Sequence, residues 1–358
     1  MPPIPVYING LGIISPQKTY EPATFLDEVI PVVSNQLRCQ EPVYKDYISG
    51  DLVRRMSRLI KMGIASSRIC LQDAGCVMPD AIITGTGLGC IEDTEKFLSA
   101  MINNKEEFLT PTPFIQSTHN TVGAQIALLL KCHHYNFTYV HRGHSFESAL
   151  FDASLQLDTT DAKNILVGGL DELTANLFQI TKRLGHWKTK PVNNLQLLNT
   201  KTRGSIAGEG SAFFLLSNMQ TDRSYAKLSG LSMLLKPSTP DEFFLKVTGL
   251  LEKNDLKLEN IDLILLGLNG DEKMDRVYDD LISAAAGMSD MAYFKHLSGE
   301  YQTASAFGLW LASRVLKSQR IPEVIRLSGS FNRPVKNILL YNHYRNLNHS
   351  LMLLSKLN

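Results

Sequence analysis

Four histidines lie close together in the sequence, and imidazole side chains are common metal ligands. They form two pairs, His133 with His134 and His141 with His144. Zinc sites usually combine histidine with nearby cysteine or carboxylate ligands. No nearby cysteine and acidic pair completes an obvious site, and a stretch that favours a β-strand separates the two histidine pairs. We therefore interpret these histidines as polar residues at turns and at a helix start, and we expect no metal site.

Ser145, which directly follows His144, has a hydroxyl that a neighbouring imidazole could activate as a nucleophile. A serine just before an apolar helical run is also a preferred residue at the N-terminal end of a helix. The second interpretation is favoured, because nothing in the sequence supplies the further groups that a serine nucleophile needs.

Two glycine-rich segments could in principle bind phosphate. They are TGTGLG at residues 84–89 and GEGSA at residues 208–212. The first lacks the Lys-Ser/Thr of a P-loop and the full G-x-G-x-x-G spacing of a dinucleotide-binding turn. A tight turn next to a strand is the favoured interpretation of both segments.

A cationic stretch occurs on the first long predicted helix, where Arg54, Arg55, Arg58 and Lys61 follow one another at short spacing. Such a stretch is either a solvated helix surface or a contact for an acidic partner. Both interpretations stay open at the level of the sequence.

The elements that must position these residues alternate between apolar strands and amphipathic helices. We predict strands over residues 6–14, 81–84, 137–141, 165–167, 212–216, 227–235, 261–266, 338–341 and 351–354. We predict helices over residues 53–71, 122–130, 146–157, 241–253 and 303–317. This alternation indicates an α/β fold with sheets covered on both faces. A polar stretch, 217–225, separates two parts of similar element content, 1–222 and 223–358, which suggests a duplication.

The composition is ordinary for a globular protein of 358 residues, with 44% hydrophobic and 20% charged residues. A net charge of +1 indicates no general affinity for nucleic acid. The 5 cysteines form no C-x-x-C pair, and we interpret them as buried thiols in a reducing compartment. No export signal or run of about 20 apolar residues occurs, so we expect a cytoplasmic protein without a membrane span.

Several segments occur in an order that is typical of one protein family. They are VYINGLGIISP at 6–16, RRMSRLIKMGIASSRICLQDAG at 54–75, GTGLG at 85–89, TPFIQSTHNTVGAQIAL at 112–128, VGGLDE at 167–172 and GEGSAFFLL at 208–216. This succession resembles the β-ketoacyl-acyl carrier protein synthases, the condensing enzymes of fatty acid and polyketide assembly. The resemblance implies a thiolase-like fold, with two similar halves in a five-layer αβαβα sandwich, and a dimer.

The resemblance also implies a cysteine nucleophile at a helix N-terminus and two histidines that stabilise the enolate and the oxyanion. Gly143 stands at the cysteine position, in the segment YVHRGHSFESAL. Asn269 and Glu300 stand at the two histidine positions, while the family's lysine is kept as Lys295. Acyl transfer through a covalent thioester is therefore not expected.

A fourth departure concerns the glycine-rich phrase that gates the acyl pocket in this family. The corresponding residues here are His343, Tyr344, Arg345 and Asn346. The glycines that permit loop movement are replaced by bulky or polar residues. We expect these four residues to lie at the pocket.

These departures make the chain similar to chain length factors, which pair with an active ketosynthase and shape its tunnel without chemistry of their own. The pathway would be fatty acid, polyketide or aryl polyene biosynthesis. An alternative is a malonyl-carrier-protein decarboxylase that uses Asn269 and Lys295. A further alternative is a homodimeric scaffold that binds acyl carrier protein. We expect no cofactor, and Arg54, Arg55, Arg58 and Lys61 are candidate contacts for a carrier protein or a partner subunit.

Overall fold

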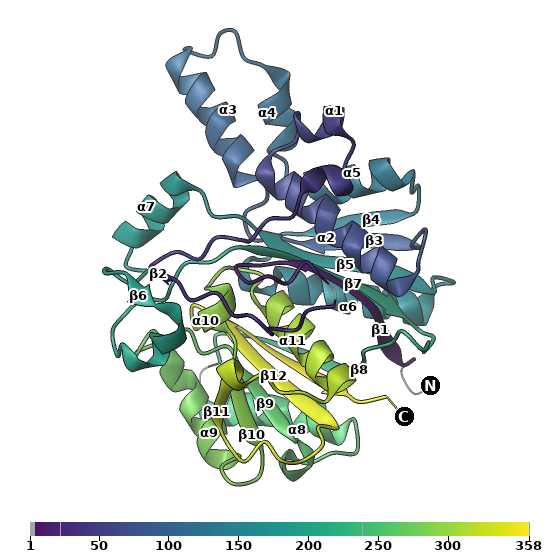
Figure 1. Ribbon diagram of the computed structural model, residues 1–358, viewed down its shortest axis with the longest axis vertical. Helices are drawn as coiled ribbons and strands as arrows, with labels where there is room; N and C mark the ends of the chain where they lie inside the picture. Colours follow the sequence, from purple (N-terminus) through teal and green to yellow (C-terminus); the bar gives the residue numbers. More distant parts are fainter. Residues whose placement is uncertain (1–3, 22, 238, 358) are drawn as a thin grey trace.

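The protein is described by a computed structural model that covers residues 4–21, 23–237 and 239–357 (Figure 1). Within these residues, the main sheet contains 11 strands in the order β11-β10-β9-β12-β13-β8-β1-β7-β5-β3-β4. A small second sheet pairs β2 (Val33–Ser34) with β6 (Val192–Asn193).

The first half of the main sheet has the order β4-β3-β5-β7-β1. These strands are β1 (Val6–Ile14), β3 (Ala81–Gly85), β4 (Tyr135–Tyr139), β5 (Asn164–Asp171) and β7 (Gly210–Ser217). Strand β3 runs parallel to both β4 and β5, whereas β7 is antiparallel to β5 and β1. Strand β4 is left at the open edge.

The second half repeats this arrangement in the order β10-β9-β12-β13-β8. Its strands are β8 (Ala226–Leu235), β9 (Leu263–Leu266), β10 (Asp290–Tyr293), β12 (Asn337–Tyr344) and β13 (Asn348–Ser355). Strand β9 is parallel to β10 and β12, and β13 is antiparallel to β12 and β8. Both halves thus place their strands, counted along the chain, in the order 3-2-4-5-1. The short β11 (Arg326–Ser328) adds to the edge, and β8 joins the halves by pairing with β1.

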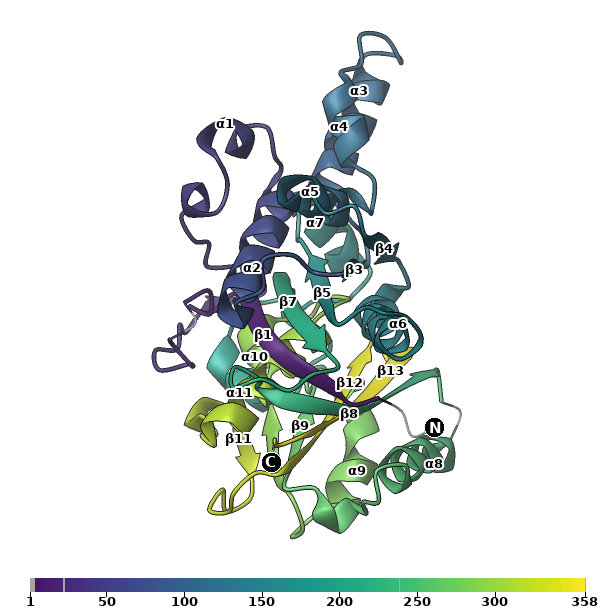
Figure 2. The same ribbon diagram turned by 90° about the vertical axis from the view of Figure 1, so that its right-hand side faces the viewer.

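Helices cover both faces of the strands in five layers (Figures 1 and 2). The central layer contains α6 (Ser145–Thr159) and α11 (Ser305–Ser318), and their apolar residues belong to one core. On the outside lie α2 (Arg58–Ala74) and α5 (Thr121–Leu130) against the first half, and α8 (Pro240–Glu252) and α9 (Asp279–Ala284) against the second.

Alternation along the strands shows how both sheet faces are buried. In β9, Leu263 and Leu265 point into the central core, whereas Ile264 and Leu266 point into the outer core under α8 and α9. Successive side chains of a strand point to opposite faces, so a wholly apolar strand requires cover on both sides. The predicted α/β sandwich of two similar halves is confirmed.

Local sequence signals set the ends of several helices. Thr239 caps α8 by accepting a hydrogen bond from the Glu242 backbone N–H at 3.3 Å, and Pro240 occupies the first helical position. Gly75 ends α2 in the left-handed region, with φ of 65°.

Some boundaries differ from the predictions. The helix predicted over 53–71 is wrong at its start, because α1 (Gly50–Val53) ends in a turn and α2 begins at Arg58. The strand predicted over 137–141 lies two residues earlier, as β4, because His141 enters the turn before α6.

Other elements were not predicted at all. Helices α3 (Ile91–Asn103) and α4 (Pro111–Gln116) form an arm that projects from the body of the molecule (Figures 1 and 2). Helix α7 (Ala175–Arg183) and the short α10 (Lys295–Ser298) were also not predicted from the sequence. In the described part of the chain, no helix combines the length and the apolar composition needed to cross a membrane.

Candidate functional site

Three chain segments meet at one edge of the second half-sheet and form the candidate site. Asn269 follows β9, and Tyr344 ends β12, the parallel neighbour of β9. The carboxyl ends of parallel strands share an edge of the sheet, which is where ligand sites of α/β proteins usually lie. Lys295 begins α10, and Glu300 follows that helix. Gly143 approaches from the first half, in the 3-10 turn η2 (Arg142–His144) that precedes α6.

Asn269, Lys295 and Glu300 form one buried hydrogen-bonded network. The Lys295 ammonium donates to both Glu300 carboxylate oxygens at 3.0 and 2.8 Å and to the His343 carbonyl at 2.8 Å. The Asn269 side-chain amide donates to Glu300 Oε2 at 2.7 Å. The two polar groups that could have polarised a substrate are therefore directed at a carboxylate of the protein itself.

Gly143 has no room for a side chain. A Cβ atom at this position would lie 2.3 Å from the Cβ and 2.9 Å from the Cγ of Tyr344, and 3.1 Å from the Cβ of Asn348. Distances below 3 Å between such atoms do not occur without a shift of the backbone or of the neighbour. Tyr344 thus occupies the space that a side chain at residue 143 would need.

The space left at this site is small. A cavity of about 30 Å³ borders Asn269, Glu300 and Tyr344. This is roughly the volume of one water molecule, far below the 300–1,000 Å³ typical of a small-molecule site. A malonyl or longer acyl group does not fit here.

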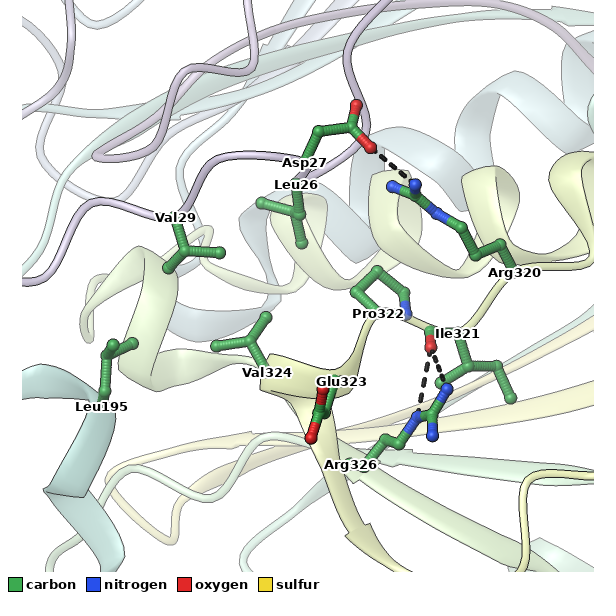
Figure 3. A pocket seen from close by; sticks show the side chains of 10 residues that line it. All are labelled: Leu26, Asp27, Val29, Leu195, Arg320, Ile321, Pro322, Glu323, Val324 and Arg326. Carbon is green, nitrogen blue, oxygen red and sulfur yellow. Dashed lines mark hydrogen bonds and ion pairs between the residues drawn. The ribbon is translucent and has the colours of Figure 1, made fainter.

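A larger cavity lies elsewhere, between the N-terminal loop and the segment after α11 (Figure 3). It measures about 620 Å³ and is an open groove with an apolar floor. Arg320 pairs with Asp27 at 2.5 Å on one side, and Arg326 donates to the Ile321 carbonyl on the other. Asp27 and the two arginines at its rim are thus engaged with the protein.

The segment predicted to gate the pocket forms the end of the β12–β13 hairpin. His343 and Tyr344 belong to β12 and pair with His349 and Asn348 of β13. Arg345 and Asn346 turn the chain with φ of 54° and 52°, in the left-handed region. Tyr344 and Arg345 border the cavity of the site, and the His343 carbonyl accepts from Lys295. A hydrogen bond of 3.1 Å from the Asn346 N–H to His343 Nδ1 ties the turn back to β12.

Burial changes the protonation of groups around the network. Asp275 accepts hydrogen bonds from the backbone N–H groups of Asn269 and Gly270 at 2.9 and 2.8 Å, and its burial raises its pKa to about 7. His343 is fully buried, and desolvation, with the charge of Lys295, holds the pKa of its imidazole well below the ordinary value. His349 is likewise desolvated, which lowers its pKa to about 4.

The histidines that lie close together in the sequence are not arranged as metal ligands in the described part of the chain. His144 Nε2 lies 3.0 Å from the His349 carbonyl and its Nδ1 lies 3.1 Å from the Asn348 amide, so both ring nitrogens have protein partners. Among residues 4–21, 23–237 and 239–357, no group of three or more His, Cys, Asp or Glu side chains comes close enough to hold a metal ion.

Ser145 stabilises the turn before α6. Its hydroxyl accepts from the His141 backbone N–H at 2.8 Å and donates to the Arg142 carbonyl at 2.7 Å. The predicted N-cap role is wrong, because Ser145 is the first residue of α6 and His144 is the N-cap residue. The Ser145 hydroxyl bonds instead to the backbone of the preceding turn.

The cationic stretch does not form one surface. Arg58 donates to both carboxylate oxygens of the buried Glu209 at 2.6 and 2.7 Å, and also pairs with Glu41. Lys61 lies over the Tyr44 ring, 5.5 Å from its centroid. Only Arg54 and Arg55, in the turn between α1 and α2, are exposed. Arg58 thus binds within the protein, because GEGSA carries the buried carboxylate that it neutralises.

Sequence reasoning missed Asp171, which connects the glycine turn at 84–89 with Thr303, just before the central helix α11. Its carboxylate accepts from the Gly87 and Leu88 N–H groups at 2.7 and 3.3 Å and from the Thr303 N–H at 3.0 Å. The N–H groups that could have bound a phosphate are therefore taken, which confirms that TGTGLG is a turn. The signal in the sequence was an acidic residue at the end of the apolar strand in VGGLDE.

Comparisons with known proteins support the fold. No protein-family model matches the chain, and no curated protein is similar in sequence. Among solved structures, the ishigamide ketosynthase/chain length factor superimposes with a TM-score of 0.79 at 16% identity, covering 99% of both chains. This chain has the ketosynthase fold.

Two further structures agree. A β-ketoacyl synthase from Burkholderia phymatum STM815 gives a TM-score of 0.77 at 14% identity, over 99% of this chain and 100% of the other. The AntDE:AntF complex, a type II PKS acyl-carrier protein with its ketosynthase bound to the hexaketide, gives 0.78 at 12% identity over the same shares. At such identities the ketosynthase fold is common to all, while the roles of individual residues must be argued from this chain.

Proposed function

We propose that this protein is a non-catalytic ketosynthase-fold subunit, similar to a chain length factor, that pairs with an active ketosynthase. The observation that carries the proposal is the closed centre: Tyr344 packs over Gly143, and Glu300 binds Lys295. Lys295 and Asn269 donate to groups of the protein itself, where a catalytic site would direct such donors at a substrate oxyanion. The ketosynthase fold is kept, and the groups and the space for condensation are missing.

The cysteines cannot take over the missing chemistry. Cys39, Cys70, Cys90 and Cys132 are buried, and Cys76 is partly buried at the end of α2. Burial raises the pKa of the Cys39, Cys70 and Cys90 thiols, whereas a nucleophilic cysteine needs a lowered one. None of the five lies beside Asn269 or Glu300 in the cavity of the site.

A partner surface is supported by the open edge of the first half-sheet. Strand β4 ends the sheet and exposes Tyr135, Phe137 and, just beyond it, Val140. The Tyr135 and Phe137 rings stack 6.1 Å apart, at 11°. An edge strand with unpaired backbone groups and apolar side chains is a template for pairing with another chain. Phe151 and Leu155 of the neighbouring α6 are also exposed and extend this apolar surface.

Decarboxylation of a malonyl carrier protein is the weaker alternative. It would require Asn269 or Lys295 to stabilise an enolate, and both are bound to Glu300. A cavity of about 30 Å³ also leaves no volume for the substrate. A homodimeric scaffold is a stronger alternative than the decarboxylase, because the β4 edge could pair with a second copy of this chain as well as with a ketosynthase.

The proposal extends to organisation and partners. Residues 1–222 and 223–358 would be the two halves of a duplicated unit, as their identical strand order suggests. Acyl carrier protein would contact the assembled pair, with Arg54 and Arg55 as the candidate residues on this chain. The pathway would be the assembly of a fatty acid, polyketide or aryl polyene.

The test is co-expression with the ketosynthase encoded nearest to this gene, followed by measurement of mass and composition of the purified complex. A one-to-one heterodimer whose product length changes when this chain is absent supports the proposal. Phe137→Arg in β4 should abolish that complex, while Leu245→Arg on the exposed face of α8 should not. A homodimer that does not bind the ketosynthase would overturn it.

A further inference from the structure

The arm formed by α3 and α4 (residues 91–116) buries very little of its surface against the rest of this chain. In α3 the single buried residue is Asp93, and α4 has no buried residue. The arm's internal aromatic contact joins Phe97 and Phe114, whose ring centroids lie 5.1 Å apart. Most of the stability of a protein helix comes from packing of its apolar face, which the arm lacks in this chain alone.

The arm nevertheless carries large apolar side chains in solvent. Ile102 is 77% exposed and Phe108 is 91% exposed, and Leu98, Phe114 and Ile115 are exposed as well. Leu98 and Ile102 are four residues apart, so they lie on one face of α3. A cluster of this kind on a projecting element is typical of a protein interface.

The tip of the arm has a strained backbone. Lys105, Glu106 and Phe108 adopt φ of 52°, 68° and 53°, in the left-handed region that bulky residues rarely enter. Strained backbone of this kind is common at functional segments. Phe108, within this strained tip, has a largely exposed side chain.

The arm is continuous with the surface at the β4 edge. Helix α4 leads directly into α5, which packs on β3 and β4. Helix α5, with the sequence TVGAQIALLL, has no charged residue, yet Ala124 and Leu128 on its outer side are exposed. A helix that is apolar all round is normally covered on all sides. Exposed apolar side chains therefore occur on the arm, on α5 and on β4, three elements that lie near one another (Figure 2).

The charged residues at the tip of the arm indicate which class of partner could bind there. Glu106 and Glu107 stand beside Phe108, with Lys105 as the neighbouring cation. Acidic groups oppose a phospholipid surface, a nucleic acid and an acidic carrier protein, because like charges repel. A partner with an apolar patch and basic groups at its rim is favoured.

We infer that the arm is a clasp that closes over the ketosynthase partner when the two subunits pair along β4. This inference rests on the proposed function, and it assigns the α3–α4 tip as a second, separate contact with the same partner. Phe108 and Ile102 are its anchors, since large apolar side chains that become fully buried dominate interface energetics. The partner's apolar patch would receive them, with cations opposite Glu106 and Glu107.

The test compares two double variants in binding to the ketosynthase. Ile102→Ser with Phe108→Ser removes the anchors, and Val33→Ser with Leu245→Ser removes two side chains of similar exposure on β2 and α8. All four side chains are exposed, so both variants should fold, as circular dichroism would check. We expect the dissociation constant to rise by at least about tenfold for the arm variant and to stay unchanged for the control.

The outcomes distinguish failure of the clasp from failure of the proposed subunit function. If the arm variant binds the ketosynthase like the wild type, the clasp is overturned and the subunit proposal stands. If it binds the ketosynthase normally but loses a carrier protein, the arm serves that protein instead, and the clasp is again overturned. If the wild-type chain does not bind the ketosynthase at all, both proposals fail together.

Discussion

Tyr344 packs directly over Gly143, so that a Cβ on residue 143 would lie 2.3 Å from the Cβ of Tyr344. One residue comes from the turn before the central helix α6 and the other from the end of β12, 201 positions away in the sequence. The absence of a side chain at residue 143 and the presence of Tyr344 are therefore two aspects of one contact. This contact determines what the addition of a side chain at residue 143 would require.

Gly143→Cys should not create a condensing enzyme. The added side chain must displace Tyr344, and overpacking of this kind costs about 1–3 kcal/mol of unfolding free energy. Urea unfolding would measure the loss, and Gly50→Cys is the control, because nothing lies within 4 Å of a Cβ at that position. Tyr344→Gly in the same chain should restore part of the stability. A Gly143→Cys protein as stable as the wild type and rapidly alkylated by iodoacetamide would contradict the contact.

Lys295→Met should destabilise the protein by about 3–5 kcal/mol, because the Glu300 carboxylate would stay buried without its cation. Lys253→Met, at an exposed lysine, should change the unfolding free energy by less than about 0.5 kcal/mol. The double variant Lys295→Met with Glu300→Leu should recover much of the loss. Equal stabilities of Lys295→Met and wild type in urea would show that the pair does not contribute.

Arg58→Ala should cost about 2–3 kcal/mol, because Glu209 is buried and would lose its two hydrogen bonds from the guanidinium. Arg58 itself is partly exposed, so solvent screening reduces the effect below that of a fully buried pair. Arg55→Ala, three positions earlier and exposed, should leave thermal unfolding unchanged. If instead both variants weaken binding of a carrier protein and neither changes stability, Arg58 belongs to a docking surface.

His296 should make the protein less stable in acid. Desolvation lowers its pKa to about 3 in the folded state, against an ordinary value of 6.5. Between these values the unfolded state binds more protons, so this residue's contribution is full above pH 6.5 and is lost as pH falls. Removing it by His296→Gln should flatten the dependence of unfolding free energy on pH between 6.5 and 4, by up to about 1.4 kcal/mol per pH unit. An unchanged slope in urea unfolding at several pH values would contradict the shift.

Glu172 should affect the pH dependence of the unfolding free energy in the opposite direction to His296. Burial raises its pKa to about 7 from an ordinary value of 4.5, so the folded state keeps its proton longer than the unfolded state. Its contribution is full below pH 4.5 and is lost as pH rises through 7. Glu172→Gln should therefore gain on the order of 2–3 kcal/mol relative to wild type between pH 4.5 and 8. A constant difference between the two proteins across this range would contradict the prediction.

Most of the strands and long helices could be predicted from local patterns. Apolar runs such as 263–266 and helical spacing in 145–159 need only their own side chains to indicate their structure. The arm escaped prediction because α3 and α4 have almost no buried face, so their sequences carry little periodic signal. The observed bounds of α2 and β4 differ from the predicted ranges, because tertiary contacts determine the turns before and after these elements.

The sequence by itself determined the order of most elements and the α/β class, because these depend on residue identity and spacing along the chain. Only the tertiary structure decided which contacts Gly143, Asn269 and Glu300 make. Tyr344 covers Gly143, Glu300 binds Lys295 and Asn269, and Glu209 binds Arg58. These contacts join residues from different elements, and their distances depend on how the two half-sheets and the central helices pack, which no local pattern encodes.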